Sequence, residues 1–354
     1  MRVSRPVRTA VGRTPHVEVV VPCHNYGHFL AGCVESVIRQ PGVRTSVTIV
    51  DDASTDDSAD IGERLARTHR EVRLIRNDTN LGAVRTFNVG LARADSDYVV
   101  LLSADDLLAP GSLARATALM EARPSVGLVF GHAQKFATHP VPHPARPAVT
   151  WTTWRGEEWI ERQLRRAWNN ISSPEAVVRT YVQHEAGYYD PGLPRTHDVE
   201  MWLRIAALAD VGHINGVEQA YYRRHEASHS SQFSASQDAE ERWRAYDQFL
   251  SRWTQAEPAV RLRSIAQRRL SDEVLFDLLR ELDRGDVTEQ TITGVLEVAA
   301  RIDPDVVGRG QWADVQAGRS GTHRPSAAAL TRTAGRELAR LARWHRWRRF
   351  RYLG

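Results

Sequence analysis

Five consecutive apolar residues, from Tyr98 to Leu102, constrain the fold of this chain more than any other stretch. A strand with one face in water alternates apolar and polar residues. An unbroken apolar run suits a strand covered on both faces, as in a parallel sheet between helices. Two acids, Asp105 and Asp106, follow the run. Ligands bind at the carboxyl ends of the strands in open α/β sheets, so we expect a ligand at these acids.

Two adjacent carboxylates repel each other unless a positive charge lies between them. Divalent cations of the Mg²⁺ type prefer oxygen ligands and are commonly bound by one or two carboxylates together with substrate phosphates. The pair Asp105 and Asp106 therefore predicts a divalent metal (Mn²⁺ or Mg²⁺) and a phosphate-bearing ligand. The alternative is that one of the two acids only caps the helix predicted over Leu113–Ala122.

The chain before this run alternates strand and helix patterns. Strand patterns cover residues 17–21, 47–50, 72–75 and 98–102, and helix patterns cover residues 29–40, 58–69 and 83–94. This alternation predicts an α/β fold with a doubly wound, mostly parallel sheet. The first two strands lead into His24-Asn25 and Asp51-Asp52, which we expect at the same sheet edge as Asp105. Asp52 is suited to accept hydrogen bonds from the base or ribose of a nucleotide, or to cap the next helix.

Composition excludes several classes of protein. The net charge of +4, with 42% hydrophobic and 25% charged residues, is ordinary for a globular protein. Because no apolar run approaches about 18 residues, we predict no transmembrane helix. The basic N-terminus lacks the apolar core of a signal peptide. Two cysteines, Cys23 and Cys33, do not make a disulfide framework, so we expect both to be reduced and the protein to be cytoplasmic.

Three blocks follow one another across about the first 135 residues: VVVPCHNYGHFLAGCVESVIRQ, VTIVDDASTDDSADI and NLGAVRTFNVGLARADSDYVVLLSADDLLAPGSL. In their order and spacing they resemble the nucleotide-sugar-binding half of family two glycosyltransferases. The resemblance implies the A-type glycosyltransferase fold, a nucleotide-diphosphate sugar donor and a divalent metal. The family's acidic motif is usually Asp-x-Asp, and Ser103 replaces its first acid here.

The resemblance also implies roles for individual residues. The residues implied to bind the nucleotide are Pro22, His24, Asn25, Asp52, Asn80 and Asp105. The implied metal ligands are Asp105, Asp106 and His225, the last within a closing Tyr-Arg-x-His block.

The stretch HDVEMWLR at residues 197–204 resembles the acceptor side of the same family, where an acid pair precedes Trp-Leu-Arg. His197 stands in place of the first acid. Asp198 aligns with the second, which implies that it is the general base of an inverting displacement. That role requires one carboxylate within hydrogen-bond reach of the acceptor hydroxyl. The alternative is that Asp198 only caps a helix, with Met201 and Trp202 in the core.

The rest of the chain predicts further segments. We expect a disordered basic lead-in at 1–15, a catalytic domain at 16–231 (donor half 16–135, acceptor half 136–231), a helical appendage at 232–307, a linker at 308–330 and a basic amphipathic helix at 331–354. Arginines interleaved with aromatic residues in the last segment are typical of binding to an anionic membrane surface. An arm for a nucleic acid or an acidic partner is the alternative. We interpret the aromatic segment 151–168 mainly as a packed amphipathic helix, and a sugar-stacking or acceptor-facing wall is the alternative.

These features predict an inverting, metal-assisted glycosyltransferase that acts on a hydroxyl of a glycan or lipid-linked acceptor. We expect a place in the synthesis of cell-envelope glycan, glycolipid or polysaccharide, in the cytoplasm or on the inner face of the membrane, with no nucleic-acid partner. A nucleotidyltransferase would need a Gly-rich basic loop after the first strand, which PCHNYGHF is not. The remaining alternative is an inactive nucleotide-sugar-binding module that kept the fold.

Overall fold

The computed structural model describes residues 1–7, 12–138, 146–167, 169–224, 234–254, 256–284, 287–319 and 338. The chain divides into two compact units, one made of residues 1–160 and 170–228 and the other of residues 161–169 and 229 onwards. Within the described ranges, no helix is long and apolar enough to cross a membrane.

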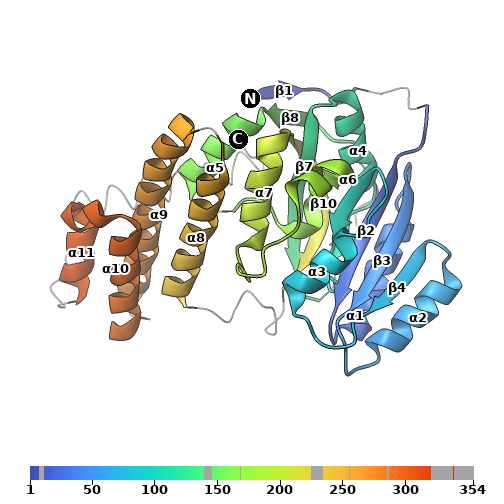
Figure 1. The fold of residues 1–354 in the computed structure, drawn as a ribbon, viewed down its shortest axis with the longest axis horizontal. Coiled ribbons are helices and arrows are strands. Elements are labelled where there is room, and N and C mark those ends of the chain that lie inside the picture. The colour runs from blue at the N-terminus through green and yellow to red at the C-terminus, as the bar shows by residue number, and fades with distance from the viewer. Residues whose placement is uncertain are drawn as a thin grey trace. The chain divides into compact units, whose positions relative to one another are not determined.

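The described residues of the first unit form one mixed sheet of ten strands (Figure 1). Its order is β1-β8-β10-β7-β9-β5-β2-β3-β4, and β6 pairs with β10. The strands are β1 Arg2–Ser4, β2 His16–Cys23, β3 Arg44–Asp51, β4 Val72–Arg76, β5 Tyr98–Leu101, β6 Leu107–Leu108, β7 Val126–Phe136, β8 Thr150–Trp154, β9 Val177–Arg179 and β10 Asp210–Arg223. Strands β5, β2, β3 and β4 are parallel neighbours, whereas β9 is antiparallel to both β5 and β7. The predicted doubly wound, mostly parallel sheet is confirmed.

Helices connect these strands and cover both faces of the sheet. They are α1 Gly27–Ile38, α2 Ser58–Thr68, α3 Ala83–Leu91, α4 Ser112–Ala122, α5 Gly156–Arg166, the 3₁₀ turn η1 Ser173–Glu175, α6 Thr180–Ala186 and α7 His197–Leu208. Leu30 of α1 and Leu113 of α4 share one core cluster with Val19. On the opposite face α3 approaches so closely that a Cβ on Gly90 would lie 2.3 Å from the side chain of Val20. The run 98–102 is buried throughout, as its composition predicts.

Two expectations for the first unit are wrong. Arg2–Ser4, placed in a disordered lead-in, forms β1 and pairs antiparallel with β8, because β8 otherwise has an open edge. Residues 151–154, placed in a helix, form β8 instead. Aromatic and β-branched residues favour a strand, and β8 buries Trp151 and Trp154. Trp168 lies outside the described residues.

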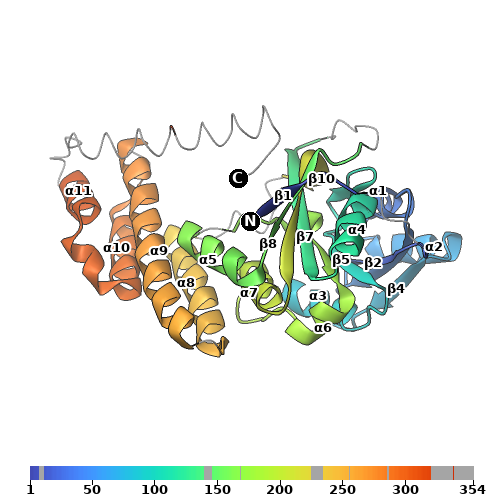
Figure 2. The same ribbon diagram turned by 90° about the horizontal axis from the view of Figure 1, so that it is seen from above.

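The second unit is helical (Figure 2). It contains residues 161–166 of α5, α8 Ala235–Arg252, α9 Ala256–Arg284, α10 Glu289–Ile302, the 3₁₀ turn η3 Pro304–Gly308 and α11 Gly310–Arg319. Helix α11 occupies residues expected to be a linker, and that expectation is wrong there, because α11 packs on α9 and buries Val315 completely. The predicted helix at 331–354 lies outside the described residues except for Leu338.

A buried carboxylate ties three parallel strands together. Glu18, in β2, is 2% exposed. It accepts hydrogen bonds from Thr48 Oγ1 of β3 at 2.6 Å and from Arg73 Nη2 of β4 at 2.5 Å. Arg73 Nε also donates to Thr48 Oγ1 at 2.6 Å. The Arg73 side chain keeps 48% of its surface exposed, so water screens this ion pair in part.

We expect Arg73→Met to lower the free energy of unfolding of the first unit by about 1–3 kcal/mol. Breaking a fully buried ion pair costs about 3–5 kcal/mol, and the exposure of Arg73 reduces that figure. Urea denaturation of the full chain measures it. Arg70→Met is the matched control because the Arg70 side chain is 94% exposed, and its effect should stay within about 0.5 kcal/mol. Equal effects from both variants would contradict the role given to Glu18.

Candidate functional site

The first two loops at the carboxyl edge of the sheet are locked to each other. Asn25 adopts a left-handed backbone conformation with φ of +58°, which asparagine tolerates better than most residues. Its Oδ1 accepts hydrogen bonds from the N–H groups of Thr55 at 2.8 Å and Asp56 at 3.3 Å. Its own N–H donates to Ser54 Oγ at 3.0 Å. Asn25 therefore holds the second loop in shape, while part of its side chain remains exposed.

His24 and Asn80 form a polar pair at the same edge. His24 Nδ1 lies 2.9 Å from the carbonyl oxygen of Asp52, which only accepts hydrogen bonds, so Nδ1 carries the proton. In the tautomer protonated at Nδ1, Nε2 accepts a hydrogen bond from Asn80 Nδ2 at 3.1 Å. Both side chains are exposed, whereas Pro22 is buried at the end of β2. The structure thus brings together two of the residues implied to bind a nucleotide.

The carboxylate of Asp52 is hydrogen-bonded to other groups of the protein. It is 3% exposed, and its Oδ1 accepts hydrogen bonds from Leu81 N and Asn77 Nδ2, both at 2.8 Å. Its Oδ2 accepts a hydrogen bond from Gly82 N at 3.0 Å, at the start of α3. Burial acts to raise the pKa of Asp52, but these hydrogen bonds outweigh it and lower the pKa. Asp52 therefore positions the third loop by binding Gly82, the N-cap residue of α3, and it does not cap the next helix, α2, whose N-cap is Asp57.

We expect Asp52→Asn to lower the free energy of unfolding by about 1–3 kcal/mol at neutral pH, because its amide group would face backbone N–H donors. Since the pKa of Asp52 is lowered in the folded protein, the contribution is complete above about pH 4 and is lost as pH falls through the lowered value. The difference between wild type and variant should therefore shrink in acid.

Urea denaturation across the acidic pH range measures this difference. Asp78→Asn is the control, because Asp78 is exposed in the same loop. A difference for Asp52→Asn that is independent of pH would contradict the role of the carboxylate charge.

The predicted acid pair lies directly after β5. Asp106 is 2% exposed, and its Oδ1 accepts a hydrogen bond from Arg223 N of β10 at 2.8 Å. Burial, and then the negative charge of Asp105, raises the pKa of Asp106 well above its ordinary value, while Arg223 opposes the shift. Asp105 is only half buried. The anionic form of this pair is therefore destabilised, and a cation bound beside it would relieve the repulsion.

Arg223 braces the acid pair, a role that the sequence did not reveal. Its guanidinium lies between the rings of Phe29 and Phe136, 4.3 and 4.4 Å from their centroids. Nε donates to the carbonyl oxygen of Asp105 at 2.9 Å. These contacts join the end of β10 to the loop after β5. No local sequence pattern predicts these contacts, because Arg223 lies 118 residues beyond Asp105.

The acid pair fits a cation that shares its coordination with phosphate. The described residues contain no cluster of three or more His, Cys, Asp or Glu side chains placed to hold a metal. Mg²⁺-type sites need only one or two carboxylates, because waters and substrate phosphates supply the other ligands. Asp105 and Asp106 meet that requirement. His225, the third implied ligand, lies outside the described residues.

Asp198 lies in the first turn of α7. The N-cap of this helix is Thr196, so the cap role weighed for Asp198 belongs to another residue. Asp198 Oδ1 accepts a hydrogen bond from Val199 N at 2.7 Å, and Met201 and Trp202 are buried, as expected. Burial raises the pKa of Tyr189, and the negative charge of nearby Asp198 adds to this shift. Asp198 is therefore a half-buried carboxylate beside a buried phenol.

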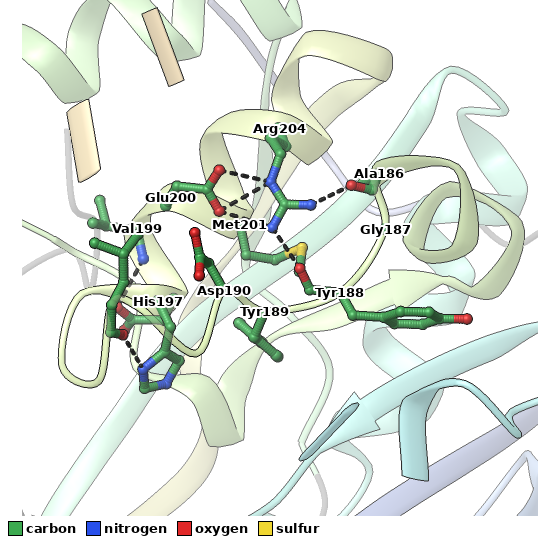
Figure 3. Close-up of polar contacts among 12 residues, drawn as sticks. Ala186, Gly187, Tyr188, Tyr189, Asp190, His197, Val199, Glu200, Met201 and Arg204 are labelled. Atoms are coloured by element: carbon green, nitrogen blue, oxygen red, sulfur yellow. Dashed lines mark hydrogen bonds and ion pairs between the residues drawn. The ribbon is translucent and has the colours of Figure 1, made fainter. Parts of the chain in front are cut away.

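An internal ion pair anchors the rest of α7. Glu200 is completely buried, and Arg204 Nε donates to both of its oxygens, at 2.8 and 2.9 Å (Figure 3). Arg204 also donates to the carbonyl oxygens of Ala186 and of Tyr188, the latter at 2.8 Å. This pair ties the chain before α7 to the helix that carries Asp198.

The family model for "Glycosyl transferase family 2" matches residues 18–177. Residues 18–177 thus belong to glycosyl transferase family 2. An uncharacterized protein of Mycobacterium tuberculosis (strain CDC 1551 / Oshkosh) is 30% identical over 201 residues, 54% of this chain and 62% of that protein. Other curated relatives, named as glycosyltransferases, match 26% to 33% of this chain. The chain spans less than two thirds of the length of these relatives.

Two solved structures share the fold of this chain. S. aureus TarS 1–349 in complex with UDP-GlcNAc has a TM-score of 0.62 and 19% identity, covering 87% of this chain and 88% of that one. The mannosyltransferase PcManGT from Pyrobaculum calidifontis, in complex with GDP-Man and Mn²⁺, has a TM-score of 0.50 and 16% identity, covering 88% of each chain. The predicted A-type glycosyltransferase fold is confirmed.

Proposed function

We propose that this protein is an inverting glycosyltransferase that moves a sugar from a nucleotide-diphosphate donor to a hydroxyl acceptor. The observation that carries the proposal is the pair Asp105 and Asp106, placed after β5 at the carboxyl edge of a family 2 sheet. Asp106 is buried, and its pKa is raised first by that burial and then by the negative charge of Asp105. A diphosphate with a divalent cation is a ligand that would use such a pair.

The donor side of the proposal rests on the loops around His24. The exposed pair His24 and Asn80 offers a ring and an amide to a nucleoside, and Asn25 and Asp52 keep the loops in place. The two solved structures of this fold were determined with UDP-GlcNAc and with GDP-Man. These names support a nucleotide-sugar donor for this chain and leave the sugar and the base open.

Asp105 and Asp106, and His225 of the closing block, are the residues that would hold a divalent metal. The structure of the mannosyltransferase named above includes Mn²⁺. A divalent cation bound there would balance the charge that develops on the departing diphosphate. Arg223 keeps the main chain of Asp105 and the carboxylate of Asp106 in register for that role.

Asp198 is the general base of the proposed reaction. The acceptor oxygen forms a bond to the anomeric carbon as the bond from that carbon to the diphosphate oxygen breaks on the opposite side. Asp198 takes the proton of the acceptor hydroxyl. A single displacement of this kind inverts the anomeric configuration. A carboxylate shielded from water is better matched to this proton transfer than an exposed one, and Asp198 is half buried beside Tyr189.

The chain's last segment supports one class of acceptor. Arginines are spread over 332–351, and aromatic residues are interleaved with them from Trp344 to Tyr352, a pattern typical of peripheral binding to anionic lipid. We place the reaction at the cytoplasmic face of a membrane, on a lipid-linked or cell-envelope glycan. This segment lies outside the described residues, so the sequence pattern alone supports this part of the proposal.

Donor hydrolysis tests the reaction class without knowledge of the acceptor. The full chain is incubated with a panel of nucleotide-sugars that includes UDP-GlcNAc and GDP-Man, with Mn²⁺ or Mg²⁺, and nucleotide release is measured with and without chelator. We expect one donor to be turned over only with metal, and Asp105→Ala to lose that release. Nucleotide binding without turnover of any donor would favour the inactive binding module.

Replacing the base tests the mechanism separately. We expect Asp198→Asn to reduce the turnover rate by about 10²-fold or more, the range typical of lost general-base catalysis, with little change in donor affinity. Glu185→Gln is the control, because Glu185 is an exposed acid at the end of α6. Wild-type turnover in Asp198→Asn would contradict the role of Asp198 as general base and would leave the donor assignment unaffected.

A further inference from the structure

The side chain of Asn88 binds the main chain of Tyr189 twice. Asn88 Nδ2 donates to the carbonyl oxygen of Tyr189 at 2.7 Å, and the N–H of Tyr189 donates to Asn88 Oδ1 at 2.9 Å. The two residues are 101 positions apart in the sequence. The amide side chain of asparagine carries one donor group and one acceptor, so it can bind both the N–H and the carbonyl of one residue, as a neighbouring β-strand does. Helix α3 is therefore hydrogen-bonded to Tyr189, in the stretch of chain that precedes α7.

The same stretch is held from its other side by α7. We call residues 186–190 the strap. Arg204 donates to the carbonyl oxygens of Ala186 and Tyr188, and Glu200 fixes the guanidinium in place (Figure 3). Gly187, within the strap, has a φ of +83°, a conformation that glycine adopts without strain. Hydrogen bonds from α3 and from α7 thus set the path of the strap.

The strap continues into the residues at the start of α7. The buried ring of Tyr189 packs edge-on against the ring of His197, with centroids 5.2 Å apart. Phe87, the neighbour of Asn88 on α3, contacts both rings, at 6.0 and 5.6 Å. His197 directly precedes Asp198. A shift of Tyr189 would therefore move the packing that surrounds the proposed general base.

We propose that Asn88 is a positioning residue for the reaction: by holding Tyr189, it fixes the strap and through it the carboxylate of Asp198. The inference rests on the proposed function, in which Asp198 is the general base. The other end of α3 is held by Asp52, so one helix joins the nucleotide loops to the base. Misplacement of a catalytic group by about 1 Å can cost about 10²-fold in rate.

The chemistry of the contact requires an asparagine. Alanine would leave the N–H and the carbonyl of Tyr189 without these partners. Aspartate would keep an acceptor for the N–H and place its second oxygen against the Tyr189 carbonyl, where no hydrogen bond forms. We therefore expect both variants to loosen the strap, and we expect Asn88→Ala to loosen it more than Asn88→Asp. Val89→Ala, at the next position of α3, is the matched control because the Val89 side chain makes no hydrogen bond.

The first arm of the test needs no activity. Hydrogen–deuterium exchange is measured on the full chain for peptides that cover residues 186–196. We expect exchange of these peptides to be at least tenfold faster in Asn88→Ala than in wild type and Val89→Ala, with the peptides of β2 and β3 unchanged. Faster exchange throughout the first unit would mean a general loss of stability, and the milder Asn88→Asp variant then provides the comparison. Unchanged exchange at 186–196 in both variants would overturn the proposal.

The second arm measures turnover of the donor found in the nucleotide-sugar panel, together with binding of its nucleoside diphosphate. We expect Asn88→Ala to lower kcat at least tenfold while donor KM and nucleotide Kd stay within about twofold. A purely structural role would change KM and Kd as well. A loosened strap with unchanged kcat, in a protein whose Asp198→Asn variant is inactive, would overturn the proposal.

The two arms separate this inference from the proposed function. If Asp198→Asn turns over the donor normally, the assignment of the base fails, and the proposal for Asn88 fails with it, whatever the exchange data show. If Asp198→Asn is inactive, the exchange and kinetic results for Asn88 decide the proposal alone.

Discussion

A carboxyl group buried beside a second acid is the constraint on which the rest of the first unit depends. Asp106 is 2% exposed at the end of β5, next to Asp105, and burying such a charge costs free energy unless partners are supplied. Arg223 supplies them in part, because its backbone N–H donates a hydrogen bond to Asp106 Oδ1 and its positive charge opposes the rise in the pKa of Asp106. The long strand β10 therefore has to return to the loop after β5. This contact joins the end of β10 to the loop after β5.

The residues around this edge order the loops of the proposed binding surface. Asn25 and Asp52 are both implied to contact a nucleotide. In the structure their side chains accept hydrogen bonds from neighbouring loops. His24 and Asn80 are left exposed on loops that are already ordered. Ordered loops reduce the entropy that must be lost on binding. Asn88 and Arg204 apply the same principle to the strap before the proposed base.

Sequence patterns predicted the sheet and the position of the acids, because both depend on local features. The apolar run 98–102 marks a buried strand, and Asp105 and Asp106 follow it directly. The partners of Asp52 and Asn88 could not be predicted, because each contact joins positions that come together only in the folded chain. Strand β1 was missed for the same reason, since its three residues become a strand only beside β8.

The central claim is that the acid pair after β5 binds a divalent cation together with the diphosphate of a nucleotide. Crystals of the full chain grown with Mn²⁺ and UDP or GDP test it most directly, by anomalous scattering from manganese. The account predicts one strong peak within bonding distance of Asp105 and of the diphosphate, lost in Asp105→Ala. A nucleotide bound at this edge without a peak there, or a peak remote from Asp105 and Asp106, would contradict it.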